Sequence, residues 1–186
     1  RLFIRRLDQS TATELPGTQG ATVPLFSPDG QWVGFVVGTK LSKVSVEGGA
    51  AVAIGDVAGS HVSGAHWGEE SGVLLSEAFG NRGLIRLPAG GGPPETIIGL
   101  GSEELAFAVP RLLPGGKAIL FASDSGGQSD LWKAERADEG RYWWQNSEFK
   151  LTRLTNDVEV EEDLRSSPTG KELAFIRGRG DLWLIG

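Results

Sequence analysis

The stretch PLFSPDGQWVGF, residues 24–35, places a Pro-Asp-Gly turn between two apolar segments. An Asp-Gly pair in this setting favours a tight hairpin, because Asp can hydrogen-bond the nearby backbone and Gly accepts positive φ. Three weaker copies follow along the chain: GAHWGEESGVLLSEA, AVPRLLPGGKAILFAS and DLRSSPTGKELAFIRG. The four turn glycines are 42, 44 and 54 residues apart: Gly30, Gly72, Gly116 and Gly170. The hairpin is therefore a repeating unit.

The second strand of each hairpin is too apolar to have a wet face, as in WVGFVV and AILFAS. Such strands are covered on both sides, as in stacked sheets. A second pair of strands follows each of the first three hairpins, for example in KLSKVSVEGGAAVAIG. Four antiparallel strands per unit, at a period of roughly 40 to 45 residues, predict the blades of an all-β β-propeller.

We expect a single propeller domain or part-propeller over residues 1–186. Its expected units are the outer strands of a split blade at 1–19, blades at 20–59, 60–105 and 106–156, and the inner strands of a last blade at 157–186. This division gives 17 strands, or about four blades per chain with one strand in surplus. Propellers typically have four to eight blades. A strained closed monomer and a piece of a longer propeller stay open, and we expect a homodimer that completes a ring of about eight blades.

Charge and composition exclude several classes of partner. The net charge of −6 and the pI near 5.0 give no electrostatic reason to bind nucleic acid or anionic lipid. The absence of Cys excludes disulfides, thiolate catalysis and Cys-ligated zinc. No apolar run approaches the roughly 20 residues that span a bilayer, so we expect no membrane insertion of this segment. Met is absent even at the first position, and we therefore expect a processed segment or an engineered chain.

The stretch FSPDGQWVGF, followed by KLSKVSVEGGAAVAI, resembles the WD40-like repeat of the TolB family, the PD40 repeat. Residues 1–122, which include RLFIRRLDQSTATELPGTQGA, resemble the propeller attached to some bacterial serine/threonine protein kinases. Later segments, such as RSSPTGKELAFIRGRGDLWLIG, are similar to generic TolB-like and tricorn-type blades. Ser166 and Thr169 depart from the repeat, so we expect weaker packing and a weaker turn in the last blade.

The resemblance implies a bacterial propeller that binds proteins or senses signals, and it suggests a periplasmic or extracytoplasmic location. It implies no catalysis by the repeats. No kinase motif and no GxSxG nucleophile elbow occurs in the sequence, so we expect no enzyme and no cofactor. Two alternatives are the accessory or gating propeller of a peptidase or other hydrolase, and an engineered or recombined propeller without a native ligand.

His61 and His66 are the only histidines, and they lie close to Glu69 and Glu70. Two imidazoles and a carboxylate can hold Zn²⁺. Because no further ligand clusters with them, we expect no metal and interpret the pair as polar residues that line the channel or join blades. Both remain candidate binding residues.

Tyr142, Trp143 and Trp144 lie in a long insertion between the outer strands of the third complete blade. If they continue a strand, they must point to both of its faces. We expect contact with the core or a second subunit first, and ligand binding as the alternative. Aromatic residues beside the hairpin turns are expected to pack between blades: Phe26, Trp32, Phe35, Trp67, Phe121 and Phe175. The acidic run at 157–163 is expected to be a solvated strand edge.

Overall fold

The computed structural model describes residues 1–57, 61–69, 72–77, 82–101, 107–124, 129–138, 142–146, 148–156, 161–178 and 180–185, without the side chains of residues 161 and 162. Over these residues the chain forms 17 β-strands and two single-turn 3₁₀ helices, η1 (Pro114–Gly116) and η2 (Trp143–Gln145). The all-β expectation is confirmed. No helix within the described ranges is long and apolar enough to cross a membrane.

Five antiparallel sheets follow one another along the chain, and in each the strands pair in sequence order. The first two sheets are β1 (Phe3–Ile4) with β2 (Thr13–Glu14), and β3 (Thr22–Phe26), β4 (Trp32–Val37), β5 (Lys40–Ser45) and β6 (Val52–Asp56). The third is β7 (Val62–Gly68), β8 (Gly72–Glu77), β9 (Leu84–Leu87) and β10 (Glu95–Ile98). The fourth is β11 (Phe107–Leu112), β12 (Ala118–Ser123), β13 (Asp130–Arg136) and β14 (Phe149–Arg153). The fifth is β15 (Glu161–Ser166), β16 (Leu173–Arg177) and β17 (Asp181–Ile185).

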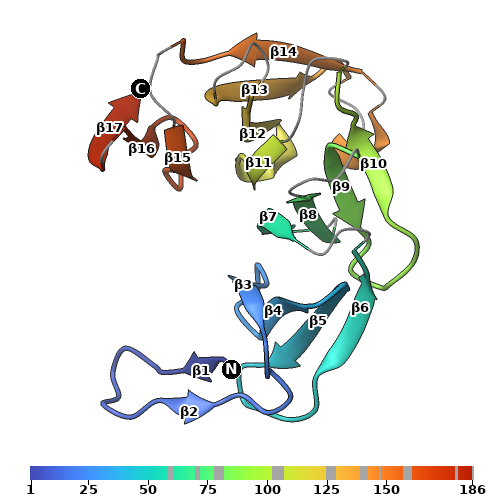
Figure 1. Cartoon of the computed structure of the whole chain (residues 1–186), viewed down its shortest axis with the longest axis vertical. Coiled ribbons are helices and arrows are strands. Elements are labelled where there is room, and N and C mark those ends of the chain that lie inside the picture. The colour runs from blue at the N-terminus through green and yellow to red at the C-terminus, as the bar shows by residue number, and fades with distance from the viewer. Residues whose placement is uncertain are drawn as a thin grey trace.

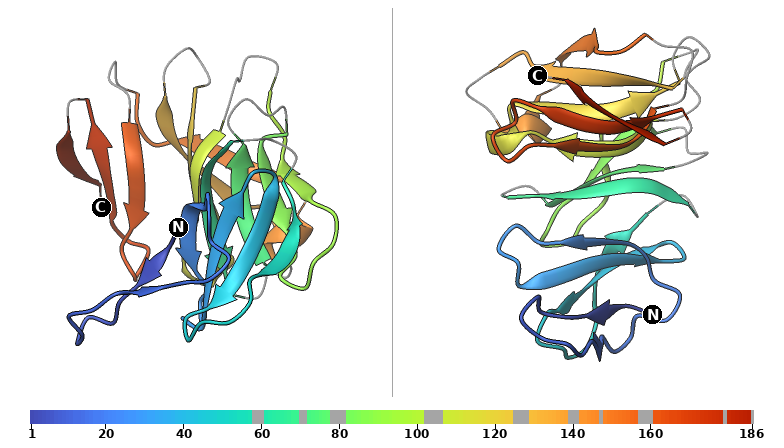
Figure 2. Two further views of the ribbon diagram at one scale, coloured as in Figure 1. Left: turned by 60° about the horizontal axis from the view of Figure 1, so that its bottom comes forward. Right: turned by 90° about the vertical axis from the view of Figure 1, so that its left-hand side faces the viewer.

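The sheets are arranged as propeller blades around an arc that is open between its N-terminal and C-terminal ends (Figure 1). The first strands of the blades, β3, β7, β11 and β15, lie on the inside of the arc, and β6, β10 and β14 lie on the outside. A side view shows the sheets stacked one above the other (Figure 2). The predicted grouping of strands into two, four, four, four and three is present in the part of the chain that the structure describes.

The turn between β3 and β4 uses the chemistry that its sequence predicts. The Ser27 hydroxyl donates to the Asp29 carboxylate at 2.5 Å, and the amide of Gln31 donates to the same carboxylate at 3.0 Å. Gly30 has a φ of 68°, in the left-handed region that favours glycine. The hydrogen bond from Ser27 lowers the pKa of Asp29, with a further contribution from the Gln31 amide. The carboxylate is thereby stabilised in its charged form.

The turn between β15 and β16 is better supported than its sequence predicts. The amide of Gly170 donates to Ser167 O at 2.9 Å, the same length as the matching bond from Gly30 to Ser27. The carboxylate of Glu172 accepts from the Ser167 hydroxyl at 2.6 Å and from the Thr169 hydroxyl at 3.3 Å. Glu172 therefore supplies the carboxylate that Thr169 lacks, and the expectation of a weaker turn is wrong on this point.

The second strands of the three complete blades are covered on both faces, as predicted. Every residue of β8 and β12 is buried, and so are the four central residues of β4. Successive residues of β8 enter different clusters: Val73 and Leu75 pack toward the β3–β6 blade, and Leu74 packs toward the β11–β14 blade. The core is thus a series of apolar layers between neighbouring blades.

Three aromatic side chains beside the turns follow the prediction, and Phe26 departs from it. Phe35, Phe121 and Phe175 are each 1% exposed. Phe26 is 62% exposed, which contradicts its expected role in packing between blades. The physical reason is that only the two-stranded β1–β2 sheet precedes the β3–β6 blade, so no inner strand covers Phe26.

The inner strands β7 and β11 approach each other closely near Gly64. A Cβ atom built on Gly64 would lie 2.7 Å from Val109 Cα and 3.0 Å from Val109 N, both in the next blade. The neighbouring Ser63 hydroxyl donates to Phe107 O at 3.2 Å and pairs with the Ser76 hydroxyl at 2.8 Å. Glycine at position 64 therefore sets the spacing of β7 and β11.

Candidate ligand-binding cleft

A half-open cleft of about 660 Å³ lies where the inner strands of the middle blades meet their turns. Its lining residues are Pro28, His66–Glu69 at the end of β7, Leu112–Gly116 at the end of β11 and in η1, Arg136, Tyr142–Trp144, and Ser166–Pro168 at the end of β15. Segments from four consecutive blades therefore form its wall. Four of the five predicted site residues line it: His66, Tyr142, Trp143 and Trp144.

The aromatic segment does not continue a strand, which corrects the sequence-based expectation. Trp143 begins η2, and the amide of Gln145 donates to Tyr142 O at 2.9 Å. Tyr142 itself is extended and directly precedes this turn, so the segment is neither a continuous strand nor a full helix.

The three rings form a compact stack at the edge of the cleft. Tyr142 and Trp144 are stacked, with centroids 4.3 Å apart and planes 13° from parallel. Trp143 meets Trp144 edge to face at 5.8 Å. Trp143 is 4% exposed, whereas Tyr142 is 51% exposed. Trp143 and Trp144 thus hold Tyr142 in place, and one part of Tyr142 remains available to a ligand.

Trp143 is seated on a glycine of the preceding turn. A Cβ atom on Gly116 would lie 2.9 Å from Trp143 Cδ1, and Gly116 has a φ of 60°. The ring packs in the cluster that includes Ile119 and Phe121. The expected core contact is therefore correct for Trp143.

Arg86 supports the stack from the neighbouring blade. Its guanidinium carbon lies 4.7 Å from the centroid of the Trp144 ring, within the range of a cation–π contact. Arg86 Nη1 also donates to Glu95 Oε2 at 2.7 Å. Sequence reasoning missed Arg86. An arginine within the apolar strand LIRL could have been noticed, because a buried charge needs a partner.

His66 is largely buried, and its burial lowers its pKa to about 4, with a smaller contribution from the nearby positive charge of Arg111. The imidazole is therefore neutral at pH 7. Arg111 Nη1 donates to Ala65 O at 2.9 Å in the neighbouring blade and to Pro110 O at 3.0 Å. Arg111 thereby fixes β11 against the strand that carries His66.

The two histidines are not brought together. His61 is exposed and precedes β7, whereas His66 lies near the other end of that strand. Five residues at roughly 3.3 Å each separate them by about 16 Å. No group of three or more His, Asp or Glu residues suited to a metal occurs among the residues the structure describes, and Glu70 lies outside them. Residues 157–160 of the acidic run also lie outside the described residues.

Comparison with known proteins supports the fold. No protein-family model matches the sequence, and no curated protein matches it. TolB from Acinetobacter baumannii matches with a TM-score of 0.66 and 18% identity over 87% of this chain and 39% of TolB. The fold is that of a TolB-like β-propeller.

Two other solved structures share this fold. The tricorn protease matches with a TM-score of 0.58 and 13% identity over 94% of this chain and 17% of the protease. A calcium-binding protein, regucalcin from Agrobacterium tumefaciens, matches with a TM-score of 0.56 and 16% identity over 84% of this chain and 50% of the regucalcin. The chain spans half or less of these three proteins, and at such identities the likeness concerns the fold alone.

Proposed function

We propose that this TolB-like part-propeller is a non-catalytic scaffold that binds a protein or small ligand in the cleft beside Tyr142. In this proposal residues 1–186 act as one domain with the blade limits given above, outside the cytoplasm, as the TolB-like resemblance implies. The observation that carries it is the convergence of His66 and the Tyr142–Trp144 stack on one cleft. These residues come from different blades, so a rigid fold is needed to place them together.

The chemistry of the cleft favours binding. Tyr142 offers an exposed ring whose position is already fixed by Trp144, so little side-chain entropy is lost when a ligand covers it. His66 is neutral and accepts or donates a hydrogen bond without the cost of desolvating a charge. Aromatic anchors in partly enclosed sites are the residues that contribute most to protein–protein affinity.

A peptide library displayed on phage tests this proposal. Peptides of twelve residues selected on the wild-type chain are synthesised, and their affinity is measured by calorimetry for wild type, Tyr142→Ala and Leu151→Ala. Leu151 is 44% exposed on β14 and does not line the cleft, so it is the matched control. We expect Tyr142→Ala to weaken binding at least tenfold, about 1.4 kcal/mol, and Leu151→Ala to leave it unchanged. Equal affinity for wild type and Tyr142→Ala would contradict the proposed site.

We further propose that the chain forms a homodimer that completes a ring of about eight blades. Apolar side chains are exposed at both ends of the arc: Phe3, Phe26, Leu182, Trp183 and Leu184. Exposed apolar patches of this kind mark interaction sites. Light scattering on a sizing column tests this proposal directly, since a homodimer has twice the chain mass of 19.7 kDa.

A further inference from the structure

The third strands of the blades share one leucine position, which identifies β1 and β17 as equivalent strands. Leu41, Leu84, Leu131 and Leu182 oppose matching residues of the neighbouring second strands: Val36, Ser76, Ala122 and Ile176. In three of the blades this residue lies three positions after the first residue of its strand that pairs with the inner strand: Val33, Ile119 and Leu173. In β8 the pairing starts one residue earlier, at Gly72, so Ser76 lies four positions after it.

Leu2, directly before β1, occupies the same position in the N-terminal sheet. The amide of Leu2 donates to Thr18 Oγ1 at 2.9 Å, and the amide of Leu131 donates to Thr155 Oγ1 at the same distance. Leu2 O accepts from the amide of Leu15, as Leu131 O accepts from that of Leu154. The described residues therefore contain five third strands but only four pairs of first and second strands.

The N-terminal end of the arc lacks the strands that the C-terminal end has. Beside β1, an apolar groove of about 280 Å³ is lined by Leu2, Phe3, Pro24, Phe26, Val33 and their neighbours. In each complete blade, first and second strands lie inside the third. The groove therefore lies where the first and second strands of a complete blade would pack. β15 and β16 are the first and second strands of the last sheet, so they are of the type that the groove fits.

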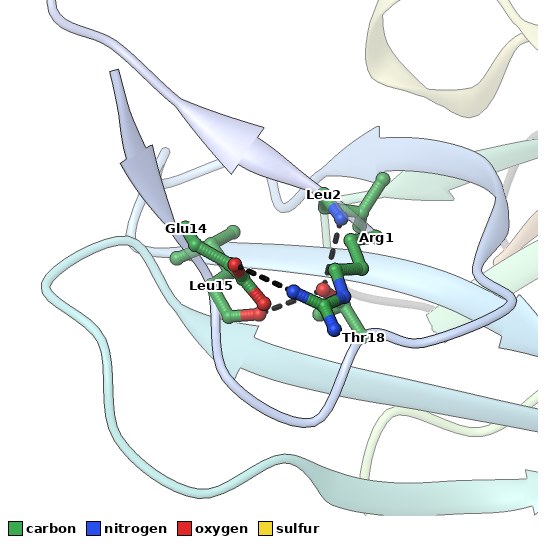
Figure 3. Close-up of polar contacts among 5 residues, drawn as sticks. All are labelled: Arg1, Leu2, Glu14, Leu15 and Thr18. Atoms are coloured by element: carbon green, nitrogen blue, oxygen red, sulfur yellow. Dashed lines mark hydrogen bonds and ion pairs between the residues drawn. The ribbon is translucent and has the colours of Figure 1, made fainter. Parts of the chain in front are cut away.

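β1 is held firmly in its place, and β17 is not. Arg1 forms an ion pair with Glu14 at 3.2 Å, and the Thr18 hydroxyl donates to Leu15 O at 2.7 Å while it accepts from Leu2, as Figure 3 shows. β17 pairs with β16 alone, and four of its five residues are exposed. Leu182 is 71% exposed, whereas its counterparts Leu41, Leu84 and Leu131 are 0% exposed. Displacement of β17 would therefore sacrifice little buried apolar area.

We propose that β17 is a displaceable strand: in a dimer, β1 of a second copy takes its place beside β16 and completes a four-stranded blade in the order β15-β16-β1-β2. This inference rests on the proposed homodimer. The hydrogen bonds that β16 loses from β17 are replaced by those of β1, and β15 and β16 cover the groove of the partner copy.

A second copy of this chain is the occupant that fits both ends. The open face of the C-terminal sheet carries Ala174, Ile176, Leu182 and Leu184, and it continues the series of apolar interfaces found between all preceding blades. The segment 1–19 has three arginines and two acidic residues, and the segment 157–186 has four basic and seven acidic residues, so their net charges of +1 and −3 are opposite. Because the two ends of the arc lie apart, the exchange joins two chains (Figure 1).

Engineered cysteines test the exchange in the full chain, which has no cysteine of its own. The pair Ala174→Cys and Leu184→Cys joins two residues that oppose each other in β16 and β17, and it locks β17 in place when oxidised. By the shared leucine register, β1 in the place of β17 sets Ile4 opposite Ala174. The pair Ala174→Cys and Ile4→Cys should therefore form a disulfide between two chains.

The expected result is a wild-type dimer, a locked variant that is monomeric when oxidised and dimeric when reduced, and a covalent dimer of the Ile4→Cys variant on a non-reducing gel. The double variant Leu151→Cys and Ala174→Cys is the control and should form no covalent dimer. A wild-type monomer at concentrations up to about 100 μM would overturn the homodimer and the exchange together. A dimer that persists after β17 is locked would keep the homodimer and overturn the exchange. Peptide binding at Tyr142 is measured separately and fails or succeeds independently of both.

Discussion

At the scale of single residues, backbone contact between blades depends on glycine. We predict that Gly64→Ala destabilises the protein by about 1–3 kcal/mol, because a new Cβ would lie 2.7 Å from Val109 Cα and force β7 and β11 apart. Urea denaturation followed by tryptophan fluorescence measures the change. Gly90→Ala is the matched control, since a Cβ at Gly90 meets nothing within 4 Å. An equal loss in both variants would mean that the contact with Val109 has no special role.

The carboxylate of the first hairpin turn allows a prediction about protonation. Ser27→Ala removes the hydrogen bond that contributes most to the lowered pKa of Asp29, so we expect the pKa of Asp29 to rise toward its ordinary value. A lowered pKa in the folded state stabilises the fold above the unfolded pKa, and this contribution is lost as the pH falls through the folded pKa. An NMR titration of the Asp29 carboxyl carbon measures both variants. An unchanged titration curve would contradict the assignment.

His66 gives a second pH dependence, of the same sign but at higher pH. The folded-state pKa of His66 is about 4 and its ordinary value is 6.5. Between pH 4 and pH 6.5 the imidazole is therefore protonated in the unfolded chain and neutral in the folded chain. Stability should therefore fall as the pH drops from 6.5 to 4, by about 3 kcal/mol at most from this residue. His66→Gln should flatten this part of the profile whatever its stability at pH 7. Parallel wild-type and variant profiles would show that His66 is not buried as described.

At the scale of strands and turns, sequence reasoning succeeded where the information is local. The Pro-Asp-Gly turn and its copies, each followed by a strongly apolar strand, were enough to predict the hairpins and the grouping of strands. Sequence reasoning failed for Tyr142–Trp144. The hydrogen bond from the Gln145 amide to Tyr142 O closes a 3₁₀ turn, and a single turn is too short to leave a periodic pattern in the sequence. Sequence reasoning also missed that Glu172, three residues beyond Thr169, replaces a missing Asp.

The replacement in the last turn can be measured. Glu172→Gln should destabilise the hairpin of β15 and β16 by less than about 1 kcal/mol, because a neutral amide accepts weaker hydrogen bonds than a carboxylate. Adding Thr169→Asp to this variant restores the sequence of the first turn and should recover the loss. Hydrogen exchange of the amides of β16 reports the local change. Failure of the second substitution to restore protection would show that Glu172 acts in another way.

At the scale of the whole molecule, the cleft could not be predicted, although most of its residues were singled out. Its wall combines His66 with Tyr142 and with the turn at Ser167, which are far apart in sequence and meet only through the curvature of the arc. The repeat does place the hairpin turns of all blades at the same end of the propeller. From this alone, Pro28, Pro114 and Pro168 could have been predicted to lie on one side of the molecule. Whether these turns line one cleft depends on the angle between neighbouring blades. That angle is set by side-chain packing between the sheets and cannot be predicted from the sequence of a single repeat.

The two ends of the arc should differ in their contribution to stability. In stacked repeats a terminal unit stabilises the chain through the one interface that it covers. The segment 1–19 supplies Leu2, Ile4 and Leu15 to the cluster around Phe35, and Leu15 is 2% exposed. Burial of such a side chain stabilises by about 1.5–3 kcal/mol. Leu182 and Leu184 of β17 are more than 70% exposed and supply far less.

Removal of residues 1–19 should therefore lower the urea midpoint of unfolding much more than removal of residues 180–186. The comparison is made on dilute, monomeric samples, so that any dimer does not contribute. The two truncations also separate stability from assembly: loss of 1–19 should abolish the dimer, because β1 is the exchanged strand, whereas loss of 180–186 should favour it, because the edge of β16 is then free. Equal midpoints for the two truncations would mean that β1 and β2 do not cover the face that carries Phe35. A dimer that survives without residues 1–19 would mean that the C-terminal ends pair with each other.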